Sequence, residues 1–481
     1  MSFNNLNCQL PASSLTSIAR CAGFTLLLVT NDLVLRDPAV LLQGVGVANI
    51  ASSVAQTSLD VPFLALLFAV GAASLGRPAL VSERRLLAAQ AVSGAAALCA
   101  GLPLALAGGS EALAIALFCA LGAFAAFGLL CWVSLLARVA VERAWLEIVI
   151  CLGVSAFGYL FFLHLAEACP VCVVLGCLSA ASIAATALFI RFDASKPGSE
   201  VRDGELAHRD GRRLKDLVRS DYTAVLCIAA LNFVLAASRS TLDFASAVTV
   251  HSICALGICA ASVLLFVVSF ASARDVGVKP VYQAAFPFIS LAFLLLPFLG
   301  EAAKGLFMFG STALGTMGTT ALLLMAFQAK RATGLSAVGV YGVYSGFVHL
   351  FLLVGNITSL GDVGVDGASY AGYSIFGMLV VYVLILVLVV SRRRTADRQV
   401  GPGIVFVGDE EAFSRICRTL ADEHDLSQRE LEVMKLLMLG KSVKAIGDEL
   451  CIAQSTVRTH TRNMYRKLDV HSRGELFELI A

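Results

Sequence analysis

The chain has 481 residues, of which 58% are hydrophobic and 15% are charged, and its mean hydropathy is +0.83. These values exclude an ordinary water-soluble globular protein, in which about a quarter of the residues are charged. The net charge of +2 indicates little by itself, because the positions of Lys and Arg decide how a membrane protein is oriented.

Long apolar runs fill the chain up to residue 390, and most reach the roughly 20 residues that a helix needs to cross a bilayer. The predicted spans are residues 16–35, 60–76, 86–107, 112–136, 145–164, 170–190, 222–238, 248–272, 281–299, 305–327, 334–355 and 370–390. A polar gap at residues 191–220 separates the first six from the last six. The sequence therefore predicts an all-α, twelve-span membrane domain over residues 1–391.

The polar gap contains many Lys and Arg residues, so the positive-inside rule assigns it to the cytoplasm. Counted outward from this gap, the loops are alternately rich and poor in cations. Arg84 and Arg85 lie in one cation-rich loop, and Arg392 to Arg394 follow the last span, whereas Glu111 and Asp243 lie on the opposite side. We therefore expect a multi-pass protein of the cell (inner or cytoplasmic) membrane with a cytoplasmic C-terminus.

Residues 39–59 are long enough to cross, but Gln43, Asn49 and Gln56 make the segment polar for contact with lipid. We interpret it as an outer loop or a surface helix. A thirteen-span alternative places the N-terminus outside and keeps the C-terminus in the cytoplasm.

Six spans, a long basic loop and six more spans resemble the layout of major facilitator transporters. The signature loop of that family matches in part: the segment GRPALVSERR supplies Gly76, Arg84 and Arg85 but lacks the Asp. The resemblance implies a membrane domain made of two halves.

Ionisable and amide side chains inside spans often line a cavity. Such residues in or near the predicted spans are Arg20, Asp32, Glu147, Asn232, Arg239, Asp243, His251 and His349. Asn232 and His349 are the candidates that we favour for a ligand cavity.

The fourteen Cys are mostly scattered through apolar runs, where Cys behaves as a small hydrophobic residue, and they do not form the pattern of a disulfide framework. The segment HLAEACPVC brings His164, Glu167, Cys169 and Cys172 together at the end of a span. A single CxxC is typical of a tight turn more often than of a thiol or metal sensor, so we predict no metal site.

Residues 392–425 form a predicted cytoplasmic linker in which Phe413, Cys417 and Leu420 share one face of a short helix. After it, Ser427 and Glu430 form a capping box at the start of a first helix that ends near Gly440. Ser442 can cap a second helix up to Leu450, a third covers residues 455–468, and Ser472 opens a terminal helix. The sequence predicts a small four-helix domain.

The third helix has an apolar face with Val457, Met464 and Leu468. Its other face carries Arg458 and Arg462, and residues 455–468 contain no acidic residue. A cationic helix of this kind fits the major groove of double-stranded DNA, where Arg contacts guanine edges or phosphates.

Residues 426–481 resemble the LuxR-type helix-turn-helix domain. The matching elements are Arg429, Glu430, Gly440, Ile446, Leu450, residues 455–460, Lys467, Leu468, Val470, Arg473 and Leu476. Carried over by position, the resemblance implies DNA contacts from Lys444, Ser455, Thr456, Arg458, Thr459, Arg462, Arg466 and His471. It also implies a homodimer through the terminal helix, with Leu476, Leu479 and Ile480.

Two positions depart from that family. Ala453 stands where a Ser usually caps the third helix, so Gln454 or Ser455 would have to cap it, and the change should cost about 1 kcal/mol. Gly447 stands where Ala is usual in the second helix, at a cost of up to ~1 kcal/mol of helix propensity.

The sequence as a whole predicts a membrane-anchored, one-component transcriptional regulator that senses a small molecule or a membrane signal. Its expected partners are DNA, the bilayer, a second copy of the chain and an unknown small-molecule ligand. The alternative is a major-facilitator-like transporter with a regulatory DNA-binding tail, and a third is a tail that binds another protein. The chain contains no nucleotide-binding Gly loop, HExxH or GxSxG motif, so we predict neither enzymatic activity nor a cofactor.

Overall fold

The computed structural model describes residues 12–35, 52–107, 110–168, 171–193, 210–237, 247–271, 300–359, 410–438, 441, 443–470 and 475–476. Within these ranges the chain forms helices and no strand, which confirms the predicted all-α fold. The chain divides into two compact units, residues 1–385 and residues 386–481.

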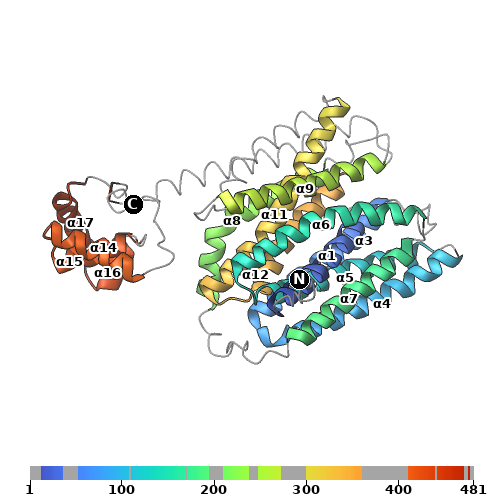
Figure 1. Ribbon diagram of the computed structural model, residues 1–481, viewed down its shortest axis with the longest axis horizontal. Helices are drawn as coiled ribbons and strands as arrows, with labels where there is room; N and C mark the ends of the chain where they lie inside the picture. The colour runs from blue at the N-terminus through green and yellow to red at the C-terminus, as the bar shows by residue number, and fades with distance from the viewer. Residues whose placement is uncertain are drawn as a thin grey trace, which may run out of the picture. The chain divides into compact units, whose positions relative to one another are not determined.

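The first unit is a bundle of long helices (Figure 1). Its helices are α1 (Ala12–Leu35), α3 (Ser52–Gly76), α4 (Glu83–Ala107), α5 (Glu111–Leu136), α6 (Val141–Ala168), α7 (Val171–Asp193), α8 (Asp210–Ala237), α9 (Ala247–Ala271), α11 (Glu301–Thr333) and α12 (Ala337–Ser359). Of the helices in the described ranges, 9 are long and apolar enough to span a membrane, and α8 adds a shorter apolar stretch. The predicted spans at 281–299 and 370–390 lie outside the described residues, so the count of twelve stays a prediction.

The start of α3 differs from the sequence interpretation. Residues 52–59 were expected to belong to an outer loop or surface helix, but α3 is one continuous helix from Ser52 to Gly76. Its polar residues are satisfied within the protein: Gln56 Nε2 donates to Asp60 Oδ1 at 2.9 Å, and Asn356 Nδ2 of α12 donates to Asp60 Oδ2 at 2.8 Å. Because these groups bond to one another, the helix can carry them without exposing them to lipid.

Helices α3 and α12 pack against each other over most of their length and so join the first half of the unit to the second. Asp60 and Asn356 meet near one end, and the hydroxyls of Ser74 and Ser336 lie 2.6 Å apart near the other. Between them the backbones come very close at Gly71 and Gly342. Small residues allow such close approach of membrane helices, so packing and hydrogen bonds together hold this contact.

Gly342→Ala is expected to lower the free energy of unfolding of the solubilised protein by about 1–3 kcal/mol, the usual cost of overpacking. A Cβ atom on Gly342 would lie 2.6 Å from the carbonyl oxygen of Leu67 and 2.8 Å from the Cα of Gly71, so backbone would have to move. Gly310→Ala is the matched control, because nothing lies within 4 Å of a Cβ there. Equal stability of the two variants in an SDS titration would contradict the packing argument.

A second pair of helices, α6 and α9, also joins the two halves. Ser262 Oγ donates to the carbonyl oxygen of Val149 at 2.7 Å, and the hydroxyl of Tyr159 lies 2.5 Å from Nδ1 of His251. These four residues are all buried. The two halves therefore meet through polar contacts as well as apolar ones.

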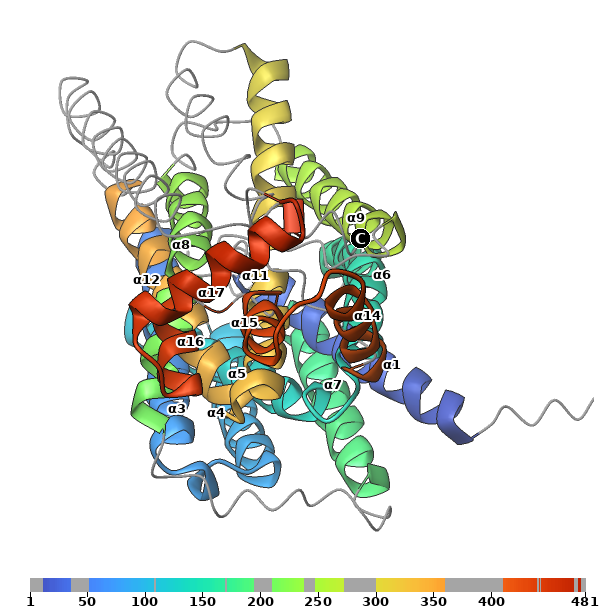
Figure 2. The same cartoon turned by 90° about the vertical axis from the view of Figure 1, so that its left-hand side faces the viewer.

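The second unit contains α14 (Glu410–Glu423), α15 (Gln428–Met438), α16 (Val443–Leu450) and α17 (Gln454–Lys467), and Figure 2 shows α17 lying against α15 and α16. Its core is built from Cys417, Val433, Met434, Leu437, Met438, Ile446, Val457, Met464, Leu468, Val470 and Leu476. Cys417 is fully buried in this core, so the short helix expected in the linker is part of the domain. A core of its own indicates that this unit can fold without the membrane helices.

Candidate nucleic-acid interface

The start of α15 is fixed by the predicted capping box. The backbone N–H of Ser427 donates to Glu430 Oε2 at 2.8 Å, and the backbone N–H of Glu430 donates to Ser427 Oγ at 3.3 Å. The prediction is confirmed. These bonds satisfy two backbone donors that a helix start would otherwise leave unpaired.

The end of α17 is attached to the same place by Lys467. Its Nζ donates to Glu430 Oε2 at 2.9 Å and to the carbonyl oxygen of Asp425 at 2.7 Å. Burial acts to raise the pKa of Glu430, but hydrogen bonds from Lys467 and Ser427 act in the opposite direction and outweigh burial. The pKa of Glu430 therefore lies below its ordinary value. The ionised carboxylate thus holds α17 against α15.

The lowered pKa of Glu430 predicts that the second unit is less stable in acid. The carboxylate stabilises the fold fully above the unfolded pKa of about 4.3, and this contribution is lost as the pH falls through the lower folded pKa. Glu430→Gln should lower the free energy of unfolding by about 1–3 kcal/mol at pH 7 and by much less at pH 3. Urea unfolding of residues 400–481, followed by circular dichroism, measures this.

Glu432→Gln is the matched control, because Glu432 pairs with Arg429 at the exposed surface at 2.7 Å. Such pairs contribute about 1 kcal/mol or less. If Glu432→Gln lowered the free energy of unfolding at pH 7 as much as Glu430→Gln, the stabilising role assigned to the Glu430 carboxylate would be contradicted.

The turn between α16 and α17 sets the angle of the third predicted helix. Cys451 has φ 53°, and a Cβ atom on Gly447 would lie 2.9 Å from the carbonyl oxygen of Ile452. Glycine at position 447 therefore allows the carbonyl group of Ile452 to come close to the backbone of α16. This role is separate from its effect on helix propensity. The N-cap of α17 is Ala453, whose methyl group cannot accept a hydrogen bond, so the expectation that Gln454 or Ser455 caps the helix is wrong.

Helix α17 presents the predicted cationic face to solvent. Arg458, Arg462 and Arg466 are exposed, one helical turn apart, whereas Val457 and Met464 on the opposite face are fully buried. Ion pairs among the described residues of this unit include Arg429 with Glu432, Lys441 with Glu449 and Lys467 with Glu430, and none of these pairs uses the three arginines. The three guanidinium groups are available to an anion.

A hollow of about 480 Å³ lies beside this face. The three arginines line it together with Thr461 and Asp469, and the apolar parts come from Val443, Tyr465 and Val470. A surface with three cations around a shallow hollow suits a phosphate backbone better than an apolar ligand.

The remaining predicted DNA contacts divide into two groups. Ser455, Thr456 and Thr459 are exposed on α17, and Thr459 Oγ1 donates to the carbonyl oxygen of Ser455 at 3.0 Å. Lys444 belongs to α16, but its side chain, like the whole of His471, lies outside what the structure describes.

The expected dimer contacts are placed only in part. Leu476 is fully buried in the core of its own unit, so it is not exposed to a partner here. Leu479 and Ile480 lie outside the described residues. The expected pairing through the terminal helix therefore rests on Leu479 and Ile480 and stays a prediction.

Residues 424–480 match the family described as bacterial regulatory proteins, luxR family. The tail is a luxR-type DNA-binding domain. This confirms the resemblance found in the sequence, while the role of α17 as the recognition helix stays a prediction.

Two relatives share the luxR-type domain. The uncharacterized response regulatory protein YgeK of Escherichia coli is 38% identical over 64 residues, which are 13% of this chain and 44% of that protein. The transcriptional regulatory protein LiaR of Bacillus subtilis is 50% identical over 50 residues, which are 10% of this chain and 24% of that protein. The chain thus spans less than half the length of these relatives.

In the membrane unit, the two residues favoured for a ligand cavity use polar atoms within their own helices. Asn232 is buried on α8 and its Nδ2 donates to the carbonyl oxygen of Ile228 at 2.9 Å. His349 Nδ1 lies 2.7 Å from the carbonyl oxygen of Ser345, and its ring and that of Phe63 on α3 pack in a T-shaped arrangement with centroids 4.9 Å apart. Their role as cavity residues stays a prediction.

Among the described residues of this unit, some buried polar groups form clusters that the sequence did not reveal as such. One is Gln56, Asp60 and Asn356 between α3 and α12. The four-residue spacing of Gln56 and Asp60 was a signal, because it puts both on one helix face, but the assignment of residues 39–59 to a loop hid it.

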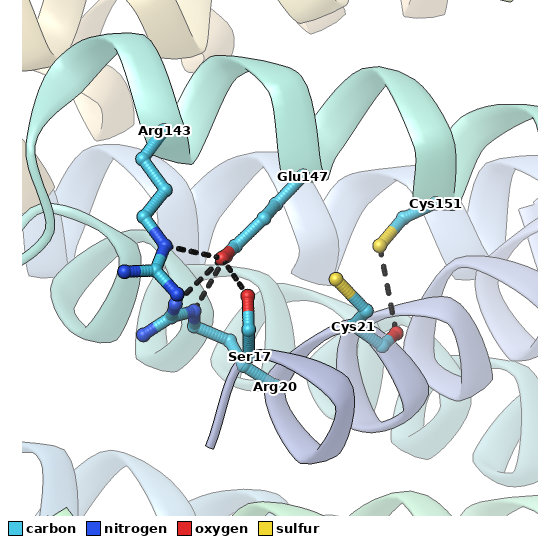
Figure 3. A network of polar contacts seen from close by, with 6 residues as sticks. All are labelled: Ser17, Arg20, Cys21, Arg143, Glu147 and Cys151. Atoms are coloured by element: carbon cyan, nitrogen blue, oxygen red, sulfur yellow. Dashed lines mark hydrogen bonds and ion pairs between the residues drawn. The ribbon is translucent and has the colours of Figure 1, made fainter. Parts of the chain in front are cut away.

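Another cluster joins α1 to α6 (Figure 3). Arg20 donates to both oxygens of Glu147, at 2.5 and 2.6 Å, and both side chains are buried. Ser17 Oγ also donates to Glu147, and Arg143 lies 3.4 Å from it at the more exposed end. The sequence identified Arg20 and Glu147 as ionisable residues near spans but not as partners.

The fold of the membrane unit is similar to that of a solved transporter. The crystal structure of a bacterial homologue of the iron transporter ferroportin in its outward-facing state aligns with a TM-score of 0.55 and 14% identity, over 78% of this chain and 98% of that chain. At this identity the likeness shows the fold alone, and it confirms the expected resemblance of the helical region to a transporter.

Proposed function

We propose that this chain is a membrane-anchored one-component transcriptional regulator. The luxR-type domain supplies DNA binding, and the observation that carries the proposal is the row of exposed arginines Arg458, Arg462 and Arg466 on α17. Two such domains, paired through a terminal helix with Leu479 and Ile480, would read a two-fold site. The proposal requires no catalytic step and no cofactor.

The membrane unit is the sensor in this proposal. The distribution of Lys and Arg in the loops supports a cell-membrane protein whose luxR-type domain lies in the cytoplasm. A small molecule, bound near residues such as Asn232 and His349, would act by favouring one arrangement of the two halves. A ligand shifts such an equilibrium by its differential affinity for the two states.

A second function is favoured by a specific observation, the likeness of the membrane unit to a transporter fold at a TM-score of 0.55. In this alternative the membrane unit moves a solute, and the luxR-type domain is its regulatory DNA-binding tail. The buried Asp60 between α3 and α12 is a group that such a pathway could use.

The first test is a DNA-capture experiment with the purified tail, residues 400–481, mixed with fragmented genomic DNA of the source organism. We expect enrichment of sites with two-fold symmetry, because two recognition helices would lie in successive major grooves. Arg458→Ala with Arg462→Ala should abolish the enrichment.

The matched control is Arg418→Ala with Arg429→Ala, which removes the same charge from exposed positions on α14 and α15. If a folded, dimerised tail enriches no sequence, or if both double variants lose enrichment equally, the proposal is overturned and transport assays on the whole chain become the next step.

A further inference from the structure

Two cysteine side chains face each other across α1 and α6 (Figure 3). Cys21 lies on α1 and Cys151 on α6, and their side chains lie next to each other. The Sγ atom of Cys151 also lies 3.5 Å from the carbonyl oxygen of Cys21. The two cysteines are thus neighbours, although the residues are 130 positions apart in sequence.

The buried ion pair fixes the register of this contact. Arg20 directly precedes Cys21, and Glu147 lies one helical turn before Cys151. A disulfide needs Cα atoms roughly 4.4–6.8 Å apart and Cβ atoms that point toward each other, so two helices must hold their register closely to form one. The bidentate contact between Arg20 and Glu147, one residue and one turn away, provides that constraint.

Other cysteines of this unit contact different groups. Cys131 Sγ lies 3.7 Å from the carbonyl oxygen of Glu83, and Cys254 Sγ lies 3.9 Å from the hydroxyl of Thr312. These two contacts are with a carbonyl and a hydroxyl oxygen, whereas Cys21 and Cys151 lie beside each other.

The location of the pair limits what can react with it. Both residues lie within candidate membrane spans, Thr16–Leu35 and Arg143–Phe162. Cys151 is only 1% exposed and Cys21 is half-buried. Because both cysteines lie in apolar helices, a lipid-soluble oxidant suits the site.

We propose that Cys21 and Cys151 form a reversible disulfide site whose oxidant is a lipid-soluble quinone. Two S–H bonds break and one S–S bond forms, and the two thiols release two protons and two electrons. The quinone takes up both protons and both electrons and leaves as the quinol. The new bond ties α1 to α6 beside Arg20 and Glu147 and is opened again by a dithiol reductant.

The test uses the full-length protein in lipid nanodiscs and does not depend on DNA binding. Reduced protein is treated with tetramethyl-1,4-benzoquinone, whose ring has no free position for addition of a thiol, and remaining thiols are blocked with iodoacetamide. Peptide mapping by mass spectrometry without reductant identifies the pairs. We expect most of Cys21 and Cys151 in one cross-linked peptide, which dithiothreitol cleaves.

Cys151→Ser should abolish this peptide and leave Cys21 open to alkylation. The matched control is Cys259→Ser, a half-buried cysteine on α9, which should leave the peptide unchanged. Diamide, a second thiol oxidant, shows whether the two cysteines can form a disulfide independently of whether a quinone oxidises them. If diamide forms the cross-link and the quinone does not, the proposal that the oxidant is a quinone is overturned. If neither reagent forms it in folded protein, the proposal that Cys21 and Cys151 form a disulfide site is overturned.

Discussion

Glu147→Ala is expected to lower the free energy of unfolding of the membrane unit by about 3–5 kcal/mol, the usual cost of removing one partner of a buried ion pair. The side chains of Arg20 and Glu147 are only 9% and 7% exposed, and the substitution would leave the Arg20 guanidinium buried without its carboxylate. An SDS titration of the protein in detergent, followed by circular dichroism, measures the change.

Arg143→Ala provides the control for this pair. Arg143 touches the same carboxylate at 3.4 Å, but its side chain is 50% exposed, so water can replace it and the loss should stay below about 1 kcal/mol. The double variant Arg20→Met with Glu147→Leu should recover most of the stability, because apolar residues of similar volume can replace a buried pair. A loss in Glu147→Ala no larger than in Arg143→Ala would show that the pair is not buried as described.

Arg458→Ala with Arg462→Ala should weaken operator binding by the luxR-type domain by about 30-fold or more. Each arginine contact to a base or phosphate contributes about 1–3 kcal/mol, and 1.4 kcal/mol corresponds to a factor of ten. Both side chains are exposed and outside the ion pairs described for this unit, so binding DNA breaks none of those pairs. Fluorescence anisotropy with a labelled operator measures the affinity.

The salt dependence of binding separates two roles for these arginines. A variant that loses a phosphate contact should reduce the slope of the logarithm of the DNA-binding constant against the logarithm of salt concentration by about one for each contact. A variant that loses a base contact should leave this slope unchanged and relax the sequence preference. Arg418→Ala with Arg429→Ala, which removes equal charge from α14 and α15, should change affinity only a few-fold. If the two double variants weaken binding equally, α17 is not the helix that reads DNA.

The tail could be predicted closely from its residues, because its signals are local. Ser427 and Glu430 are three positions apart and bond as a capping box should. The separation of Val457 and Met464 from Arg458 and Arg462 follows from 3.6 residues per turn, and the structure buries the first two and exposes the others. The prediction that Gln454 or Ser455 caps α17 is wrong, because the backbone geometry at a single residue decides which position is the N-cap, and that residue is Ala453.

For the membrane unit, the sequence by itself determined that the chain forms long apolar helices, since the length and composition of each run decide that locally. Which helices touch was decided only by the tertiary structure. The partners of Asp60, Glu147 and Cys21 lie 296, 127 and 130 positions away, and no periodicity in a single helix contains that information. Polar groups that lipid cannot satisfy must find one another across helices, so the packing of the helices fixes these contacts.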